Sequence, residues 1–177
     1  SHEIRLVSTG DGPLNYTIGA FYENYKHDYF LKWIQPEMAS TLYVDGEPGL
    51  YFRTDQVRKD KQTALFGEVS YDFTDSLTAT FGMRWFDESH SVSGVVGWGQ
   101  GIYGLRETPA DSKTSNDDTI FKGNLTWRLS DNKMVYFTYS EGYRPGGLNR
   151  DPALPSQSWI PDKVTNYEFG WKTTSED

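Results

Sequence analysis

The stretch Thr63-Ala-Leu-Phe-Gly-Glu-Val-Ser-Tyr-Asp-Phe-Thr-Asp-Ser-Leu-Thr-Ala-Thr-Phe-Gly-Met-Arg-Trp85 contains two alternating runs joined by a short polar turn. Apolar or small residues recur at every second position from Leu65 to Phe73, and again from Leu77 to Trp85. This period of two, with aromatic residues on both sides of a turn, predicts an antiparallel β-hairpin. Each arm has about ten residues, which at ~3.3 Å per residue and a ~45° tilt is enough to cross the hydrocarbon layer of a membrane.

The composition favours strands over helices as the elements that could meet lipid. Hydrophobic residues make up 36% of the 177 residues, and the mean hydropathy is −0.67, so no segment is apolar enough for a membrane-spanning helix. Aromatic residues nevertheless reach 16%. Transmembrane barrels need this mixture, because one face of each strand meets lipid and aromatic girdles lie at both interfaces. Tyr-rich lectins and β-sandwiches have similar totals, so composition alone leaves both classes open.

Charge and cysteine content exclude several function classes. The net charge is −8 with a pI near 4.9, which argues against a nucleic-acid-binding surface. There is no cysteine, so disulfide frameworks and cysteine-based metal or redox sites are excluded. The chain begins with Ser1 and carries no signal peptide, and we interpret it as a piece of a longer protein.

The same alternation recurs along the chain and predicts about seven strands. The connections between them are alternately short and long: 10–13, 26–62, 74–76, 87–118, 130–133 and 144–163. In a meander this places every long connection at one end, as in barrels with short periplasmic turns and long extracellular loops. The sequence therefore predicts an all-β fold, an antiparallel up-and-down meander of about seven strands that forms an arc of a large transmembrane β-barrel.

Charged residues in these strands lie on the face opposite the apolar rows, and we expect them to face the lumen, because charge is costly on the lipid side. The predicted lumen-facing charges are Glu3, Arg5, Glu23, Glu68, Asp72, Arg84, Lys122, Arg128, Glu168 and Lys172. A soluble sandwich with one solvated face would alternate as well. It would not explain why the long connections all fall at one end.

Glu141 is the exception to this one-sided pattern. Strict alternation through Val135, Phe137 and Tyr139 directs it towards lipid, near the outer interface, where an acidic residue costs little. We expect this interfacial position, with Arg144 as its partner. The alternative is a bulge near Gly142 that turns the carboxylate inwards.

Four segments resemble the barrel domain of TonB-dependent outer-membrane receptors. They are Tyr136-Phe-Thr-Tyr-Ser-Glu-Gly-Tyr-Arg-Pro-Gly-Gly-Leu-Asn-Arg150, Pro161-Asp-Lys-Val-Thr-Asn-Tyr-Glu-Phe-Gly-Trp-Lys172, Ser8-Thr-Gly-Asp-Gly-Pro-Leu-Asn-Tyr-Thr-Ile-Gly-Ala-Phe-Tyr22 and Phe66-Gly-Glu-Val-Ser-Tyr-Asp-Phe73. The resemblance implies a barrel of about 22 strands whose lumen is closed by a plug. Residues 1–177 would then be part of a single β-barrel domain, and the plug domain is absent from this sequence.

The function implied by the resemblance is active transport across the outer membrane. Such receptors take up iron–siderophore complexes, cobalamin or oligosaccharides with energy delivered through TonB, and an iron–siderophore complex is the substrate we expect here. The expected partners are outer-membrane lipid and lipopolysaccharide, TonB through the plug, and a small-molecule substrate. The alternatives are a passive porin or adhesin barrel and a soluble carbohydrate-binding β-domain.

No catalytic, metal or cofactor site is predicted. His2, His27 and His90 lack partners at metal-binding spacing and are interpreted as surface or lumen histidines. The acidic pairs Asp45/Glu47 and Asp117/Asp118 do not have the spacing of a calcium loop. Loop aromatic residues could stack on a ligand and arginines could pair with an anionic one. The candidate ligand contacts are Trp33, Tyr43, Tyr51, Phe52, Trp98, Tyr103, Arg144, Arg150 and Trp159.

Overall fold

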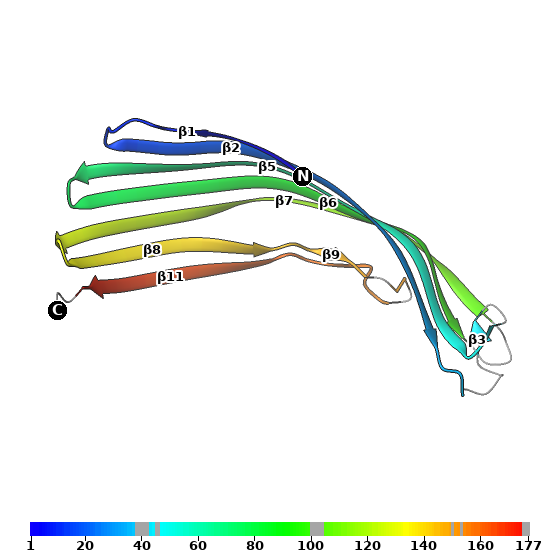
Figure 1. The fold of residues 1–177 in the computed structure, drawn as a ribbon. Helices are drawn as coiled ribbons and strands as arrows, with labels where there is room; N and C mark the ends of the chain where they lie inside the picture. The colour runs from blue at the N-terminus through cyan, green and yellow to red at the C-terminus, as the bar shows by residue number, and fades with distance from the viewer. Residues whose placement is uncertain (38–42, 45–46, 100–104, 150, 153, 175–177) are drawn as a thin grey trace.

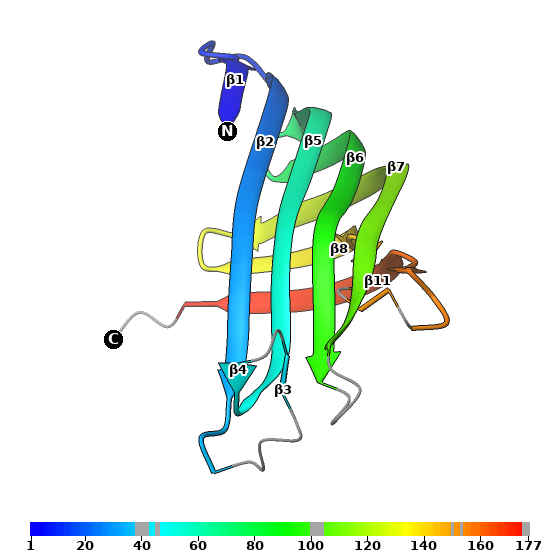
Figure 2. The same ribbon diagram turned by 90° about the vertical axis from the view of Figure 1, so that its right-hand side faces the viewer.

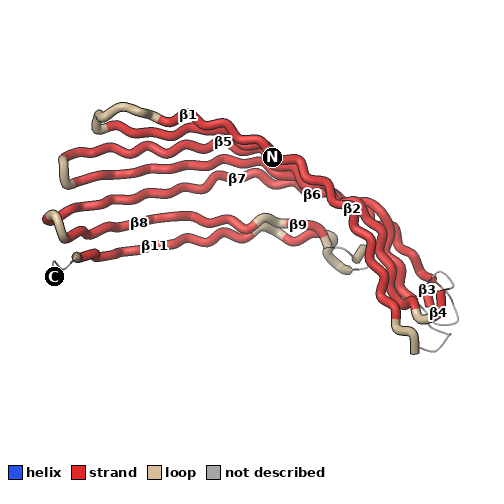
Figure 3. Tube along the Cα trace, viewed as in Figure 1, coloured by secondary structure: helices blue, strands red, loops and turns tan. Residues whose placement is uncertain are grey.

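Seven strands form one antiparallel sheet in the computed structural model (Figure 1). The structure describes residues 1–37, 43–44, 47–99, 105–149, 151–152 and 154–174. Consecutive strands of the sheet are neighbours in the order β1-β2-β5-β6-β7-β8-β11, so the sheet is an up-and-down meander. Nearly all of the described chain is strand, and it contains no helix (Figure 3). The predicted all-β meander of seven strands is confirmed.

The strands of the sheet have very different lengths. Their bounds are His2–Val7 (β1), Leu14–Ile34 (β2), Leu50–Thr74 (β5), Leu77–Gly99 (β6), Leu105–Ser130 (β7), Lys133–Arg144 (β8) and Asp162–Thr173 (β11). Two small hairpins lie outside the sheet. They pair Tyr43–Val44 (β3) with Glu47–Pro48 (β4), and Gly147–Leu148 (β9) with Ser158–Trp159 (β10).

The long connections predicted at 26–62 and 87–118 are wrong. Most of both segments belongs to β2, β5, β6 and β7, which have 21, 25, 23 and 26 residues. About 9–11 residues suffice for a strand to cross a bilayer, so each of these strands is at least about twice as long as a crossing requires. We call the parts of β2, β5, β6 and β7 that lie in these two segments, residues 26–34, 50–62, 87–99 and 105–118, the extension. Its sequence lacks apolar alternation, so the pattern by which the other parts of the strands were predicted is missing there.

The register defines two faces, since residues directly opposite each other in an antiparallel pair project to the same side. One row joins Tyr16, Val69, Phe81, Gly123, Tyr139 and Tyr167. We call its side the apolar face. Its large side chains are uncovered: Phe81 is 56% exposed and Phe169 is 75% exposed. Such a surface requires an apolar environment or partner.

The register also places all ten predicted lumen charges together on the opposite side, here called the charged face. Lys122 Nζ lies 3.1 Å from Glu68 Oε2 on this face. Arg84 also makes cation–π contacts, which the alternation did not predict. Its guanidinium lies 5.5 Å and 5.8 Å from the ring centres of Phe21 and Phe66.

The buried side chains gather on the charged face, mostly within the extension. They include Phe52, Thr54, Gln56, Phe86, Glu88, Val92, Val96 and Ala110. β3 contacts β5, β6 and β7, while β9 contacts β6 and β7, so two connections cover this face. Figure 2 shows the four long strands from the side, with β3 and β4 at their far end.

No helix long and apolar enough to cross a membrane occurs among the residues that the structure describes.

Candidate functional site

β8 separates from β7 halfway along the sheet. Their pairing ends at Lys122 and Ser140, whereas β8 stays paired with β11 up to Arg144 and Asp162. Beyond this point the β8–β11 pair leaves the plane of the longer strands and carries β9 and β10 (Figure 1). We call residues 145–161, which connect β8 to β11, the strap; residues 150 and 153 are outside the described part of the chain.

Glu141 lies at the point of separation. Its Oε2 accepts a hydrogen bond of 2.9 Å from the backbone N–H of Phe121, which β8 no longer pairs, and its Oε1 accepts one from the hydroxyl of Tyr139. β8 pairs with β11 from 133 to 144 without a register shift, so the alternative of a bulge near Gly142 is wrong. Glu141 thus lies on the apolar face beside Tyr139. The predicted partner is also wrong, because Arg144 pairs with Asp162.

Two side chains at the base of the strap reach across to the charged face of the extension. Tyr143 and Lys163 are directly opposite each other on β8 and β11. The Tyr143 hydroxyl donates a 2.7 Å hydrogen bond to Glu88 Oε1, and its ring lies 4.4 Å from that of Phe86. Lys163 Nζ donates a 2.7 Å hydrogen bond to Asp118 Oδ1. Tyr143 and Lys163 belong to the side of the β8–β11 pair that, nearer the turn at 130–133, is part of the apolar face. At the level of the strap, this same side packs against the charged face of the extension.

These two contacts change the pKa of Tyr143 and the pKa of Asp118. Burial and the hydrogen bond to Glu88 raise the pKa of Tyr143 well above its usual value. The hydrogen bond from Lys163 lowers the pKa of Asp118, and burial opposes this only in part. Tyr143 therefore stays protonated and Asp118 stays ionised at neutral pH, as the two contacts require.

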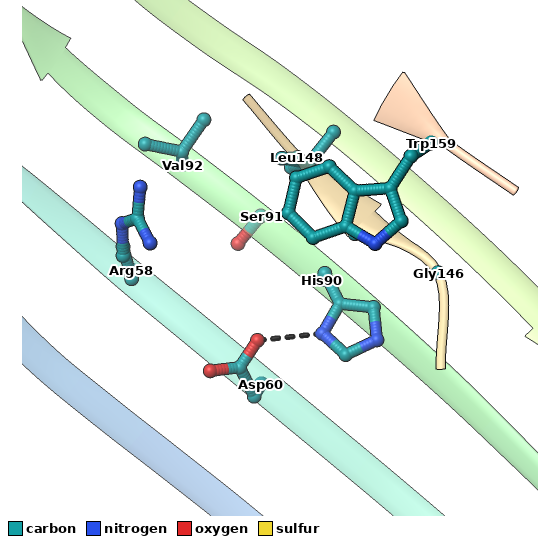
Figure 4. Close-up of a pocket in the computed structure, with 9 residues that line it drawn as sticks. Arg58, Asp60, His90, Ser91, Val92, Gly146, Leu148 and Trp159 are labelled. Carbon is teal, nitrogen blue, oxygen red and sulfur yellow. Dashed lines mark hydrogen bonds and ion pairs between the residues drawn. The ribbon is translucent and has the colours of Figure 1, made fainter. Parts of the chain in front are cut away.

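A third cluster lies beneath the strap (Figure 4). His90 Nδ1 is 2.6 Å from Asp60 Oδ1, and Nε2 is 3.8 Å from Glu88 Oε1, too far for a hydrogen bond. Glu88 is only 2% exposed. A cavity of about 150 Å³ separates Arg58, Asp60 and His90 from the strap residues Gly146, Gly147, Leu148 and Trp159. The side chains that line this cavity thus include cationic, anionic and aromatic groups.

Gly147 allows the strap to fold tightly at this cavity. A β-carbon at Gly147 would lie 2.3 Å from the indole ring of Trp159, closer than any side chain tolerates. Trp159 is therefore held against the backbone of β9, with its indole at the edge of the cavity (Figure 4).

A second aromatic group lies at the far end of the extension. Trp33, Phe52 and Trp98 are in one row of the register, on the charged face. The ring centre of Phe52 lies 4.6 Å from that of Trp33 and 4.5 Å from that of Trp98, and Tyr51 lies 5.9 Å from Trp33. Phe52 is buried, whereas Trp33 and Trp98 are 42% and 41% exposed.

The structure thus divides the predicted ligand contacts among separate places. Trp33, Tyr51, Phe52 and Trp98 form one group, and Trp159 belongs to the cavity with His90. Tyr43 lies on β3 opposite Pro48. Arg144 is exposed and bound to Asp162. Tyr103 and Arg150 lie outside the described residues.

Sequence reasoning missed the polar part of the cavity wall. His90 was interpreted as an isolated histidine, yet cross-strand pairing brings it opposite Asp60. Arg58, Asp60 and Glu88 were assigned to long connections. The signal that could have found them is register: continuing β5 and β6 outwards from Leu65 and Trp85 pairs Asp60 with His90. Within the described ranges, no group of three or more His, Asp or Glu residues could hold a metal ion.

The hydrogen bond from Tyr143 to Glu88 is expected to hold the strap in place. Changing Tyr143 to Phe leaves the buried carboxylate of Glu88 without its donor, and we expect the strap to open more readily by about 1–3 kcal/mol. Amide hydrogen exchange of residues 154–161 in the full-length protein should accelerate accordingly. Tyr25→Phe is the matched control, since Tyr25 is 51% exposed on the same face. Equal strap protection in Tyr143→Phe and the wild type would contradict this role.

The fold and the sequence both match known proteins. Residues 3–177 match the family model described as TonB dependent receptor-like, beta-barrel. The chain belongs to the TonB-dependent receptor β-barrel family. Proteins of this family are outer-membrane β-barrels that act as transport receptors and not as enzymes.

Relatives in this family span much more sequence than this chain. The pesticin receptor of Yersinia pestis is 25% identical over 183 residues, which is 99% of this chain and 24% of the relative. The rhizobactin receptor of Rhizobium meliloti is 32% identical over 104 residues, 55% of this chain and 13% of the relative. The chain therefore spans about a quarter of the length of the pesticin receptor.

A solved structure of an uptake receptor has the same fold. The crystal structure of the ferric yersiniabactin uptake receptor FyuA from Yersinia pestis superposes with a TM-score of 0.81 at 19% sequence identity, covering 99% of this chain and 26% of that one. At this level of identity the likeness concerns the fold alone.

Proposed function

We propose that this chain is part of the barrel of an outer-membrane receptor that imports a ferric siderophore complex with energy delivered through TonB. The observation that carries the proposal is the family match over residues 3–177. The names of the relatives add support for the cargo: one is a rhizobactin receptor, and the structural neighbour is an uptake receptor for a ferric complex.

The architecture agrees with a role in the outer membrane. The apolar face carries exposed aromatic and aliphatic side chains over a band that matches the length of a membrane-crossing strand. In this proposal residues 1–177 belong to one barrel domain, the charged face lines the lumen, and the plug that contacts TonB comes from another part of the protein.

The extension supplies the ligand-binding part of the proposal. In this proposal the extension lies outside the membrane. Its charged face carries the aromatic group Trp33, Phe52 and Trp98 and, beneath the strap, the cavity lined by Arg58 and Trp159. Aromatic rings stack on planar ligand groups, and a guanidinium pairs with anionic ones. A ferric complex with aromatic or carboxylate donors has both kinds of group.

Uptake by the full-length receptor tests this function. Its gene is expressed in a Gram-negative strain that lacks its own siderophore receptors, under iron limitation, with a panel of ⁵⁵Fe-labelled siderophores. We expect saturable accumulation of at least one complex, abolished when the same strain lacks TonB. Uptake that persists without TonB would indicate a passive porin. Accumulation of labelled cobalamin or a glycan, with no ferric complex transported, would overturn the proposed substrate.

A further inference from the structure

Carboxylates satisfy two backbone N–H groups at the edge of β7, at the point where β8 leaves it. The N–H of Phe121 donates a 2.9 Å hydrogen bond to Glu141 Oε2. The N–H of Thr119 donates a 2.7 Å hydrogen bond to Oδ1 of the preceding residue, Asp118. Every second N–H of a strand points to the same neighbouring strand, so both of these N–H groups lie on the edge that β8 would occupy.

The register shows which acceptors these carboxylates replace. Continued beyond its last pair, the register of β7 and β8 would place Phe121 opposite Glu141 and Thr119 opposite Tyr143. In a regular antiparallel ladder, residues in such hydrogen-bonded pairs exchange hydrogen bonds between their N–H and C=O groups. The backbone carbonyls of Glu141 and Tyr143 would therefore accept the two hydrogen bonds. Side-chain oxygens accept them instead, and the ladder ends.

Each carboxylate also binds a side chain of the β8–β11 pair. Glu141 Oε1 accepts a hydrogen bond from the Tyr139 hydroxyl, and Asp118 Oδ1 accepts one of 2.7 Å from Lys163 Nζ. An ionised carboxylate has about four lone-pair sites, so it can hold a backbone donor and a side-chain donor at once. Both carboxylates therefore join the edge of β7 to the β8–β11 pair, in the place of a regular ladder.

The end of the ladder determines the face to which Tyr143 points. Thr119 lies opposite Trp85, in a row of the apolar face. A continued ladder would add Tyr143 to this row, because residues directly opposite each other project to the same side. Its hydroxyl would then lie on the other side of the sheet from Glu88. The observed hydrogen bond between Tyr143 and Glu88 therefore requires β8 to leave β7 before residue 143.

Prolines confine the end of the ladder to a short stretch of β8. In the continued register, the N–H of residue 145 would point to β7, and Pro145 has none. Regular pairing could therefore not continue far beyond Tyr143. The edge of β7 itself tolerates a missing donor, because Pro109 is an even number of residues from Thr119 and its ring nitrogen falls on the same side. The change from ladder to strap thus falls at residues 141–143.

We propose that Glu141 and Asp118 end the ladder between β7 and β8 and thereby hold the strap over the cavity. They are positioning residues, because they act through Tyr143 and Lys163, which fix the base of the strap. The strap brings Trp159 to one wall of the cavity, so a strap displaced with β8 would leave that wall open. The effect on the strap stands by itself, whereas an effect on cargo binding rests on the proposed function.

The first test removes the acceptor and keeps the size of the side chain. In Glu141→Leu, the N–H of Phe121 has no side-chain acceptor, and we expect β8 to pair with β7 up to Tyr143. Amide exchange of residues 154–161 in the full-length receptor should then accelerate tenfold or more, because the strap loses the hydrogen bonds of Tyr143 and Lys163, each contributing about a factor of five. Glu141→Gln keeps an amide oxygen at the same place and should exchange at nearly the wild-type rate.

A second substitution separates a lost ladder end from a general loss of stability. Thr119→Pro removes the N–H that the carbonyl of residue 143 would need, without changing the edge that pairs with β6. In Glu141→Leu/Thr119→Pro, strap exchange should slow again towards the wild-type rate. Thr119→Pro alone should leave strap exchange unchanged, since Glu141 is still present. A general loss of stability would instead be increased by the added proline, and the double variant would exchange faster still.

Two results would overturn the proposal: strap exchange in Glu141→Leu at the wild-type rate, or strap exchange in the double variant that stays fast. If Glu141→Leu does not assemble, Asp118→Ala tests the other carboxylate. Asp118→Ala should accelerate strap exchange more than Asp118→Asn, which keeps an acceptor for the N–H of Thr119, and equal exchange in these two variants would contradict the proposal.

Uptake of the labelled ferric complex by the same variants tests the effect on cargo. The half-saturating concentration should rise in Glu141→Leu and return in the double variant, with the maximal rate kept, because the strap acts on binding. An unchanged half-saturating concentration in a variant with accelerated strap exchange would refute the role of the strap over the cavity. A receptor that imports no ferric complex but shows the expected exchange would disprove the proposed function and leave the role of the two carboxylates in place.

Discussion

Replacing Phe81 with arginine is expected to lower the free energy of unfolding of the full-length receptor by about 2–4 kcal/mol, the penalty for a cation at the bilayer midplane. Phe81 lies opposite Val69 and Gly123, in the middle row of the apolar face, and is 56% exposed. Nothing in the described chain covers it. A guanidinium at this position would therefore replace a favourable lipid contact by a buried charge.

The neighbouring Thr80 is the matched control for Phe81. Its side chain projects to the charged face, where its hydroxyl lies 2.8 Å from that of Ser70. Thr80→Arg removes one hydrogen bond between hydroxyls and should cost about 1 kcal/mol. Urea unfolding of both variants in lipid vesicles measures the difference. If Thr80→Arg were the more destabilising change, the two faces would be assigned the wrong way round.

Replacing Gly94 with valine is expected to lower the local stability of the extension by about 3 kcal/mol or more, without lowering that of the rest of the barrel. Gly94 has a φ of +141°, a conformation that residues with a β-carbon rarely adopt. An added β-carbon would lie 2.1 Å from the carbonyl oxygen of Asp55 and 2.8 Å from Cα of Gln56. Both are backbone atoms, so β5 and β6 would have to separate.

The expected result for Gly94→Val is a receptor that still forms its barrel but loses uptake of the ferric complex. Hydrogen exchange should increase in residues 53–57 and 92–96, while heat resistance of the barrel is retained. Gly123→Val is the control, because no atom lies within 4 Å of a β-carbon there and the residue is on the apolar face. Loss of the whole barrel in Gly94→Val would show that the extension and the membrane band unfold as one unit.

The membrane part of the sheet could be predicted from sequence because lipid imposes a strict pattern on it. In the proposed placement Val69 and Phe81 face hydrocarbon while Glu68 and Arg84 do not, so alternation marks both the strand and its faces. Outside the membrane this constraint ends. The run Lys59-Asp60-Lys61-Gln62 is polar at every position, although it is strand throughout. Its ladder is maintained by backbone pairing with β2 and β6, which composition does not reveal.

The candidate site was harder to predict because its residues meet through two separate structural events. Asp60 and His90 are brought together by the register of β5 and β6. Tyr143 reaches Glu88 only because β8 leaves β7, which no local pattern around Ser140 indicates. The aromatic candidates were easier to find, since tryptophans are conspicuous in any sequence, but their division into two groups follows from the strap.

The separation of β8 from β7 has a consequence for how the protein diverges in evolution. Below Lys122 and Ser140, β8 is paired on both sides, with β7 and β11. The strap instead contacts the extension, through side chains at its base and through β9, which lies against β6 and β7. Changes in parts of a protein that share no contacts add independently. We therefore expect insertions and substitutions between 145 and 161 to leave the part of the barrel below the strap intact. Under the proposed function, selection for new cargo could then act on the strap without lowering the yield of folded receptor.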